Sequence, residues 1–255
     1  MRHRLNAFFG FVGEIGIFGL RAIRDAFRPP FEFGEILNQV VEIGWRTGPL
    51  VLISGFAFGV VIALVTLASM MTFGAQAMIP EAISLGLFKD TGALITALLV
   101  SGRAGAGIGA QLAGMRVTEQ IDALETLGVD SFKYLVVTRI AACVIAIPIL
   151  TTLFNFAGMA GGLISDLMSL HITARLFIAE AFGSMAMMSD YVLPTAKTVV
   201  FGFIIGTISC YLGYTASQGA AGVGRASTRS VVFSSVLVIL VDAVLVRTIM
   251  IWYPG

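Results

Sequence analysis

Few residues could carry chemistry, and the most unusual of them are charges placed in or beside apolar runs. Arg103 and Asp242 lie well within two such runs, Lys89 lies just before the run that holds Arg103, and Lys197 lies near the beginning of a third run. A charge in apolar surroundings is costly, so each must meet an opposite charge, water or a polar ligand. Lysine binds phosphate as a point charge, which makes Lys89 and Lys197 candidates for holding a phosphate group. Snorkelling of each ammonium toward water is the alternative.

Hydrolytic and nucleotide-binding chemistry finds no support in the sequence. The patterns G-x-x-x-x-G-K-[ST], H-E-x-x-H and G-x-S-x-G do not occur. His3 and His171 both lie outside the apolar runs, so intramembrane hydrolysis lacks an obvious base. Cys143 and Cys210 have no metal-like spacing and are expected to be small buried side chains. We therefore predict no catalytic residue, no metal site and no cofactor in this chain.

Residues 118–128 form a second candidate site, a short helix that is acidic and amphipathic. Thr118 can cap its first turn, and Gly128 can end it. An anionic inner leaflet would repel its carboxylates, so a protein partner explains the pattern better than lipid does. A solvated connecting helix is the alternative. The carboxylates are Glu119, Asp122, Glu125 and Asp130, and the narrow apolar stripe consists of Ile121, Leu124 and Leu127.

The composition indicates that membrane spans must position these residues. Of 255 residues, 57% are hydrophobic and only 12% are charged, whereas a soluble domain carries roughly 25% charged residues. So little polar surface cannot face water on all sides. The formal net charge is +1, which gives no reason to expect nucleic acid as a partner.

Five apolar runs are long enough to cross a membrane as helices. Each has at least the ~20 residues that span a hydrocarbon core of ~30 Å at ~1.5 Å per residue. Pro148 favours a tilt or a kink in the third run. We expect a single all-α membrane domain over residues 1–255, without a soluble domain. The five runs cover residues 48–73, 91–113, 134–165, 192–214 and 230–252.

The N-terminal segment, residues 4–27, has a different pattern from the five runs. Its apolar side chains recur at helical spacing, while Arg21, Arg24 and Asp25 lie off that stripe. This predicts an amphipathic helix that lies in the plane of the membrane interface. A sixth span is the alternative, but Glu14 would be costly at membrane depth.

The distribution of lysine and arginine predicts the orientation. With the N-terminus in the cytoplasm, eleven basic residues fall in cytoplasmic segments, and only Lys89 and Arg175 fall in outer loops. This bias favours a cytoplasmic N-terminus, and an odd number of spans then puts the C-terminus outside. The eleven residues are Arg2, Arg4, Arg21, Arg24, Arg28, Arg46, Arg116, Lys133, Arg139, Arg225 and Arg229.

The same topology allows the depths of Arg103 and Asp242 to be compared. Each lies about 12 residues from one end of its span, which is roughly 18 Å from the nearer starting face of a ~30 Å core. The two charges are therefore expected within about 6 Å of one depth and are a natural pair. The alternative is that water or backbone carbonyls interact with each of the two charges separately. In a membrane, the phosphate expected at Lys89 and Lys197 is that of a lipid.

Two blocks of sequence are specific enough to compare with a family. The first reads SGRAGAGIGAQLAGMRVTEQIDALETLGVD at 101–130 and is followed by YLVVTR at 134–139. The second reads GAAGVGRAS at 219–227 and STRSVVFSSVLVILVD at 227–242. These blocks resemble the MlaE/YrbE family, the permease subunits of MCE-type lipid ABC transporters, and the resemblance extends over most of the chain from about residue 48.

The chain also departs from that family in three places. Gln111 stands where the family usually has Glu, and KDTGA at 89–93 stands where the family tends to have R-E-L-G-P. Ser69 and Met70 replace a Gln-Gly pair that is common late in the first span.

The resemblance implies that the acidic helix is a coupling helix, which docks on a separate ATPase that carries ATP and Mg²⁺. It also implies a non-catalytic homodimer in a bacterial inner membrane, with two ATPase subunits, MCE-domain proteins on the outer face, a STAS-domain regulator and a phospholipid substrate. The alternatives are a channel or secondary transporter that acts without an ATPase, and an intramembrane enzyme. The coupling role is carried over to Glu119, Gln120, Ile121, Asp122, Ala123, Leu124 and Glu125.

Overall fold

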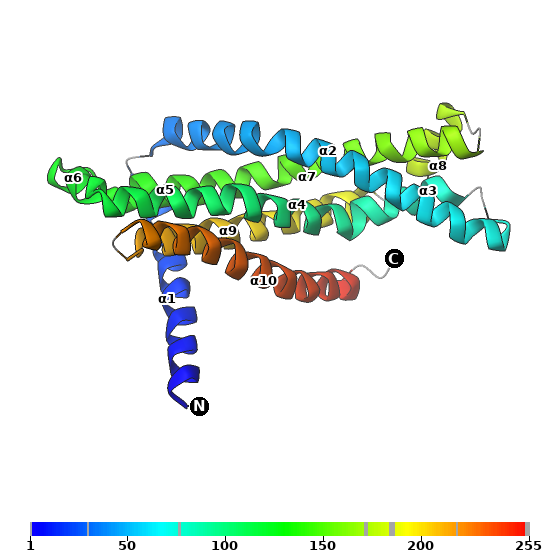
Figure 1. Ribbon diagram of the computed structural model, residues 1–255. Coiled ribbons are helices and arrows are strands. Elements are labelled where there is room, and N and C mark those ends of the chain that lie inside the picture. The colour runs from blue at the N-terminus through cyan, green and yellow to red at the C-terminus, as the bar shows by residue number, and fades with distance from the viewer. Residues whose placement is uncertain are drawn as a thin grey trace. The chain divides into compact units, whose positions relative to one another are not determined.

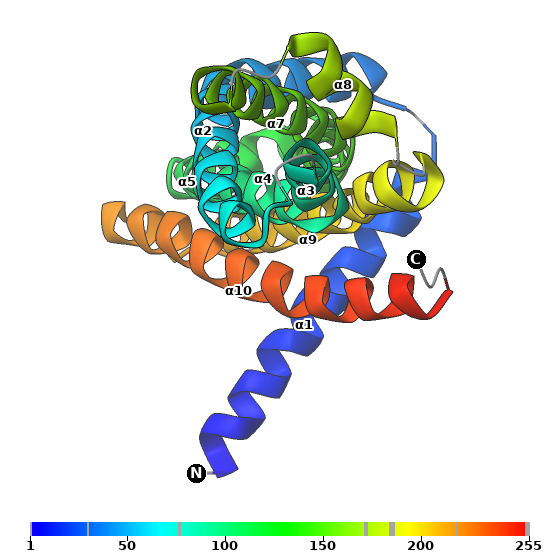
Figure 2. The ribbon, with the colours of Figure 1, turned by 90° about the vertical axis from the view of Figure 1, so that its right-hand side faces the viewer.

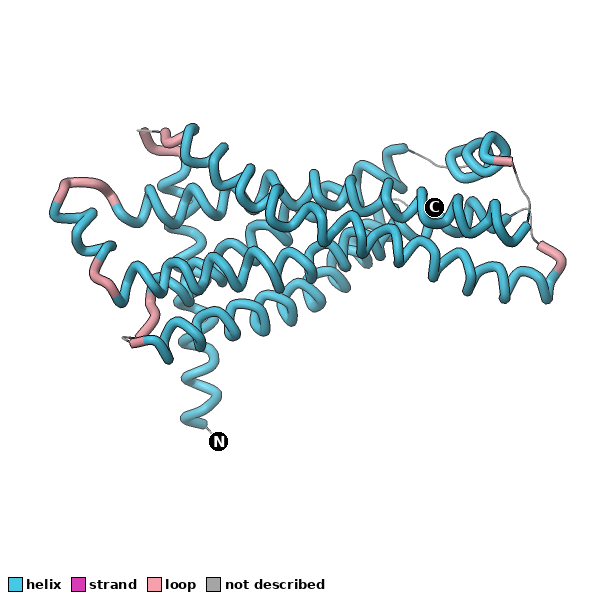
Figure 3. The backbone as a smooth tube through the Cα atoms, turned by 45° about the horizontal axis from the view of Figure 1, so that its top comes forward, coloured by secondary structure: helices cyan, strands magenta, loops and turns pink. Residues whose placement is uncertain are grey.

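The protein is an all-α polytopic membrane protein. Five helical stretches are long and apolar enough to cross a membrane, and the helix α1 (Arg2–Ala26) precedes them. Short loops join the helices, and the described residues include no strand (Figure 3). The predicted fold class with five spans is therefore confirmed. The computed structural model describes residues 2–29, 31–75, 78–170, 173–183, 187–217 and 219–252.

The helices follow one another along the chain as Figure 1 shows. The first span is α2 (Phe33–Phe73) and the fifth is α10 (Ala220–Trp252). The second span joins α3 (Ile79–Gly86), the π-helical η2 (Leu87–Thr91), α4 (Gly92–Val100), the π-helical η3 (Ser101–Gly105) and α5 (Ala106–Val117). The remaining elements are α6 (Gln120–Thr126), η4 (Phe132–Val137), α7 (Thr138–Leu170), α8 (Ala174–Gly183), η5 (Met187–Val192) and α9 (Leu193–Tyr214).

The helix of the first span begins at Phe33, well before the apolar run that starts at residue 48. Polar residues recur every three or four positions in its first part, so they share one edge of the helix. These polar residues lower the local hydropathy, although the other side of the helix remains apolar. The apolar run alone therefore underestimates the length of the helix. The polar residues are Glu35, Gln39, Glu42 and Arg46. In the third span, α7 continues through Pro148 without ending.

Helix α1 crosses α9 (Figure 2). The crossing is close because Gly19 faces α9, where an added Cβ would lie 3.2 Å from Phe203. The ring of Phe18 packs edge-on against Phe132, with 5.0 Å between the ring centroids. One side of α1 stays exposed and apolar, as an interfacial helix requires, although its position in the interface remains a prediction. The exposed side chains include Val12, Ile17, Leu20, Ile23 and Phe27.

The described residues form two compact units, each built from parts of several helices. The first unit comprises residues 1–43, 100–146 and 201–238. Within it, the hydroxyls of Ser101 and Ser234 lie 2.6 Å apart and join the second span to the fifth. This polar contact fixes a helix pair at a place where apolar side chains would give no preferred register.

The second unit comprises residues 44–99, 147–200 and 239–255. Within it, α2 and α7 touch through their backbones, because a Cβ added at Gly59 would lie 1.9 Å from the carbonyl oxygen of Gly158. A Cβ at Gly161 would likewise lie 2.2 Å from the carbonyl oxygen of Phe56. Only glycine permits such an approach, which is a common way for helices to associate in lipid.

Candidate functional site

The acidic helix α6 begins in an unusual backbone conformation. Glu119 has a φ of +58° and is the one non-glycine residue with a positive φ in the described part of the chain. The predicted cap at Thr118 is wrong. Its hydroxyl donates back to the carbonyl of Gly114 at 2.9 Å, and Glu119 takes the N-cap position without a side-chain hydrogen bond. A threonine after a helix can bond to the preceding turn instead of capping the next one.

The end of α6 agrees with the sequence. Gly128 has a φ of +80°, and its N–H donates to the carbonyl of Glu125 at 3.0 Å. The N–H of Val129 donates to the carbonyl of Leu124 at 3.1 Å. These two bonds form a Schellman motif, which confirms that Gly128 ends the helix and fixes the direction in which the chain leaves it.

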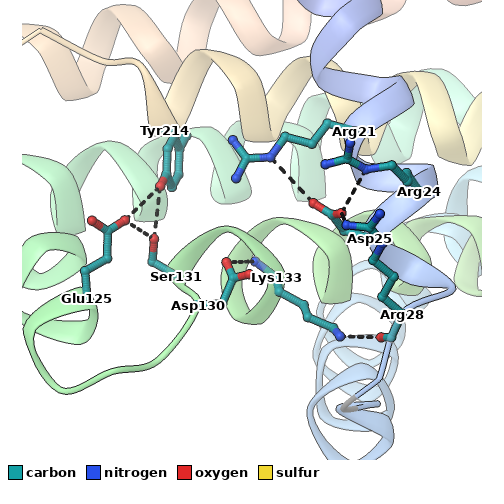
Figure 4. A network of polar contacts seen from close by, with 9 residues as sticks. All are labelled: Arg21, Arg24, Asp25, Arg28, Glu125, Asp130, Ser131, Lys133 and Tyr214. Carbon is teal, nitrogen blue, oxygen red and sulfur yellow. Dashed lines mark hydrogen bonds and ion pairs between the residues drawn. The ribbon is translucent and has the colours of Figure 1, made fainter.

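Side chains on α6 divide into an anchor and an exposed surface. Ile121 is fully buried, whereas Leu127 is 78% exposed. Asp122 pairs with Arg116 at 2.6 Å, with both side chains about half exposed. The carboxylate of Glu125 accepts a hydrogen bond of 2.5 Å from Ser131, as Figure 4 shows. The helix is therefore held in place while its carboxylates and one large apolar side chain remain accessible.

A second polar network lies beside the beginning of η4 and is drawn in Figure 4. Asp25 is surrounded by three guanidinium groups, with atoms of Arg21, Arg24 and Arg28 between 3.3 and 3.9 Å from its oxygens. The ammonium of Lys133 donates to the backbone carbonyl of Arg28. This network ties the end of α1 to the third span. The sequence analysis missed it, although the spacing of Arg21, Asp25 and Arg28 by four and three residues could have indicated it.

Lys197 lies in the second unit among carboxylates, where its side chain is 2% exposed. Its ammonium is 2.8 Å from a carboxylate oxygen of Asp242 and also contacts Asp90. A lipid phosphate would have to compete with both carboxylates, and phosphate binding at Lys197 stays a prediction. The hydrophobic pattern could place the lysine near the start of a span, but it could not identify which charges of other spans it meets.

Lys89 is more accessible, since about half of its side chain is exposed and its ammonium is 3.5 Å from Asp190. Lys89 and Asp90 lie in the π-helical η2, and Asp190 lies in the π-helical η5. Single π-helical turns are often found at functional sites. Phosphate binding at Lys89 stays a prediction.

The partner of Asp242 differs from the one expected. Its carboxylate is held by Lys197, and Arg103 forms no ion pair with any described residue. The side chain of Arg103 is exposed, beside Gly102, where an added Cβ would meet nothing within 4 Å. The observed partner of Asp242 within the second unit is Lys197, whereas Arg103 belongs to the first unit, and the Arg103–Asp242 pair stays a prediction.

Two polar side chains of α7 are buried without a hydrogen bond to any described residue. Neither amide atom of Asn155 and neither carboxylate oxygen of Asp166 has a partner there. Buried polar groups without partners are uncommon. The sequence analysis missed both, and the only available signal was their polarity inside or directly after an apolar run.

The sequence of this chain is similar to those of known proteins. The family described as "Permease MlaE" matches residues 36–248. A probable ABC transporter permease protein of Rickettsia bellii is 38% identical over 229 residues, which cover 90% of this chain and 88% of that protein. One from Synechocystis is 36% identical over 198 residues, covering 78% and 75%.

A third relative carries a more specific name. The intermembrane phospholipid transport system permease protein MlaE of Haemophilus influenzae is 28% identical over 240 residues, which cover 93% of this chain and 91% of that protein. A family match over residues 36–248, together with relatives that align over most of their length, shows that this chain belongs to the MlaE permease family and is an ABC transporter permease subunit.

Proposed function

We propose that this permease moves phospholipid between the inner membrane and the outer envelope, driven by ATP hydrolysis on a separate ATPase subunit. The observation that carries the proposal is the geometry of α6. This helix is anchored by Ile121 and ended by a Schellman motif at Gly128, and it presents carboxylates with the exposed Leu127. A rigid, charged helix with one accessible apolar side chain is suited to a protein partner.

The same geometry supports our proposal that α6 is a coupling helix. It follows α5 directly and is joined to η4 by a five-residue connection, so it lies between the second and third spans. A displacement of α6 would therefore reach both spans through short, hydrogen-bonded connections. ATP and Mg²⁺ would bind the ATPase, and this chain would supply no catalytic group.

Phospholipid is the proposed substrate because of the name of the Haemophilus influenzae relative, an intermembrane phospholipid transport system permease protein. Lys89 adds a half-exposed cation in η2 of the second span, which a lipid phosphate could approach. Transport breaks no bond in the lipid, which agrees with the lack of a hydrolase motif in the sequence.

The proposal includes a homodimer in the inner membrane with a cytoplasmic N-terminus. The most apolar windows of the first and fifth spans are only 22% and 17% buried within the chain, against 61% for the fourth. Their exposed apolar side chains must be covered by lipid or by a second copy. The proposed assembly also includes MCE-domain proteins on the outer face and a STAS-domain regulator. These two partners are proposed from the family resemblance alone.

The test of the ATPase dock is a charge reversal on α6. In Glu119→Lys/Asp122→Lys, the ATPase should no longer co-purify, while the variant should still be inserted in the membrane at normal levels. The matched control is Glu81→Lys/Glu180→Lys, which reverses two carboxylates of the second unit. Full co-purification and normal ATP hydrolysis with the α6 variant would exclude α6 as the dock.

A second experiment distinguishes a lipid permease from a channel or secondary transporter. The purified complex is reconstituted into vesicles, and transfer of a fluorescent phospholipid is measured with ATP and with a non-hydrolysable analogue. ATP-dependent transfer that requires the ATPase supports the proposal. Equal transfer by the permease alone would favour the alternative.

A further inference from the structure

The exposed apolar edge of α1 carries an arginine close to the end of the helix. Leu20, Arg24 and Phe27 are four and three positions apart, so they lie on one face. Leu20 and Phe27 are exposed apolar side chains, and the side chain of Arg24 is more than half exposed. An interfacial helix has this pattern, because its apolar side chains enter the lipid while its cations stay at the level of the headgroups.

An apolar cavity of about 230 Å³ lies against the same end of α1, within the first unit. Ile23 and Phe27 line it from α1, Ile140 and Val144 line it from α7, and Phe203 lines it from α9. All of its lining side chains are apolar, so water would find no hydrogen-bond partner there. Ile23 and Phe27 are also exposed at the surface. An acyl chain can therefore enter the cavity from the surrounding lipid.

Basic groups outnumber carboxylates beside this cavity. One carboxylate lies among the basic groups at the end of α1 (Figure 4), and two more lie on the wall of a polar cavity beside them. Four cations therefore meet three carboxylates, and the one uncompensated charge is positive, which favours an anion. The cations are Arg21, Arg24, Arg28 and Lys133, and the carboxylates are Asp25, Glu32 and Asp130.

Two of the cations are well placed to bind an anion. Arg24 and Arg28 each approach the same oxygen of Asp25, at 3.3 and 3.9 Å, and both side chains are more than half exposed. A guanidinium has five N–H donors, so most of their donors remain for another acceptor. Arginine commonly binds phosphate with two parallel hydrogen bonds. Arg21 is less available, because its guanidinium also lies over the ring of Phe132, 4.0 Å from the centroid.

We propose that the end of α1 binds an anionic phospholipid of the surrounding leaflet. The phosphate contacts Arg24 and Arg28, and one acyl chain enters the apolar cavity beside Phe27. With the N-terminus in the cytoplasm, as proposed above, α1 meets the inner leaflet, which is anionic, and basic pockets on that side of a membrane bind headgroups. This bound lipid is distinct from the transported one, and it holds α1 against α7 and α9.

The experiment places a tryptophan at the cavity and measures its quenching by bromine on lipid chains. The reporter is the full-length chain with Phe27→Trp, in which Trp45→Phe and Trp252→Phe remove the natural tryptophans. It is reconstituted in phosphatidylcholine vesicles with increasing fractions of brominated phosphatidylglycerol or brominated phosphatidylcholine. Phosphatidylglycerol should bind about tenfold more tightly, which is less than two unpaired basic residues would give, because Asp25 is close.

The variant Arg24→Gln/Arg28→Gln of the reporter should lower this preference to about twofold or less. Arg225→Gln/Arg229→Gln is the charge-matched control, since it removes two exposed arginines of α10 in the same unit. The control should keep the full preference for phosphatidylglycerol. High salt should weaken the preference of the reporter, because exposed charges are screened.

Three outcomes would overturn the inference. Equal quenching by the two lipids would exclude recognition of the headgroup, and this comparison needs no arginine variant, so it stands even if that variant does not fold. An equal loss in the control would reduce the effect to a general attraction between the membrane and positive charge. No quenching by either lipid would show that protein covers the cavity, either a second copy or another partner. None of these measurements uses ATP or an ATPase, so this inference and the proposed function can fail separately.

Discussion

The charges around α6 and the charges around Lys197 are similar in type but differ in their surroundings. The side chains of Arg116 and Asp122 are 42% and 57% exposed, whereas those of Lys197 and Asp242 are 2% and 7% exposed. An exposed ion pair contributes ~0–1 kcal/mol to stability. Removing one partner of a buried pair costs ~3–5 kcal/mol, because the other charge is left without compensation. The first cluster is therefore suited to recognition, and the second holds helices together.

The largest expected effect in this comparison is the removal of the buried ammonium. Lys197→Met should lower the free energy of unfolding by ~3–5 kcal/mol, since Asp242 would remain buried without a cation. The measurement is denaturant-induced unfolding of the purified protein in detergent.

Two further variants test the reason for that loss. Adding Asp242→Asn to Lys197→Met should restore part of the stability, because the unpaired charge is removed. Lys89→Met is the comparison, because its ammonium is about half exposed although Asp190 is buried, and its loss should be smaller than that of Lys197→Met. Equal losses for the two variants would show that burial of the lysine does not distinguish the two pairs.

A smaller effect is expected at the end of α6. Gly128→Ala places a Cβ in the left-handed conformation at φ +80° and should cost about 1–2 kcal/mol. Gly114→Ala is the control, because Gly114 is helical and a Cβ added to it would have no other atom within 4 Å. The control should leave the thermal midpoint unchanged or raise it, and a similar loss in both variants would contradict the role of the Schellman motif.

The smallest effect is expected at the exposed pair on α6. Arg116→Gln should change the free energy of unfolding by less than ~1 kcal/mol, and the change should shrink further in high salt. The measurement is the same unfolding experiment at low and high ionic strength. A loss as large as that of Lys197→Met would remove the contrast between the two clusters.

Structural features that depend on a single run or on one or two neighbouring residues were predictable from the sequence. The number of spans follows from apolar runs, and Gly128 marks the end of α6 because few other residues adopt a positive φ without strain. The cap at Thr118 was wrong because its hydroxyl had two possible backbone partners, and the sequence does not decide between them. The helix α2 begins before the apolar run at 48–73 because a polar edge lowers hydropathy without ending a helix.

Contacts between distant segments were not predictable in the same way. Depth along a span can be counted, but the rotation of each helix decides which charge a side chain meets. Within the second unit, Asp242 is therefore found with Lys197, a partner 45 residues away that counting depth did not predict. A polar cavity lined by Arg28, Glu32 and Asp130 was missed for the same reason, since it is assembled from the segment between α1 and α2 and the segment after α6.

The glycine contact between α2 and α7 limits how the protein can move. Within the second unit, the backbone at Gly59 meets Gly158 with no side chain between them, and Gly161 meets Phe56 in the same way. Flexible side chains can change rotamer and let helices slide, but touching backbones have no such freedom. These parts of α2 and α7 should therefore behave as one stiff element during a transport cycle. The cycle then has fewer independent moving parts than the number of spans implies.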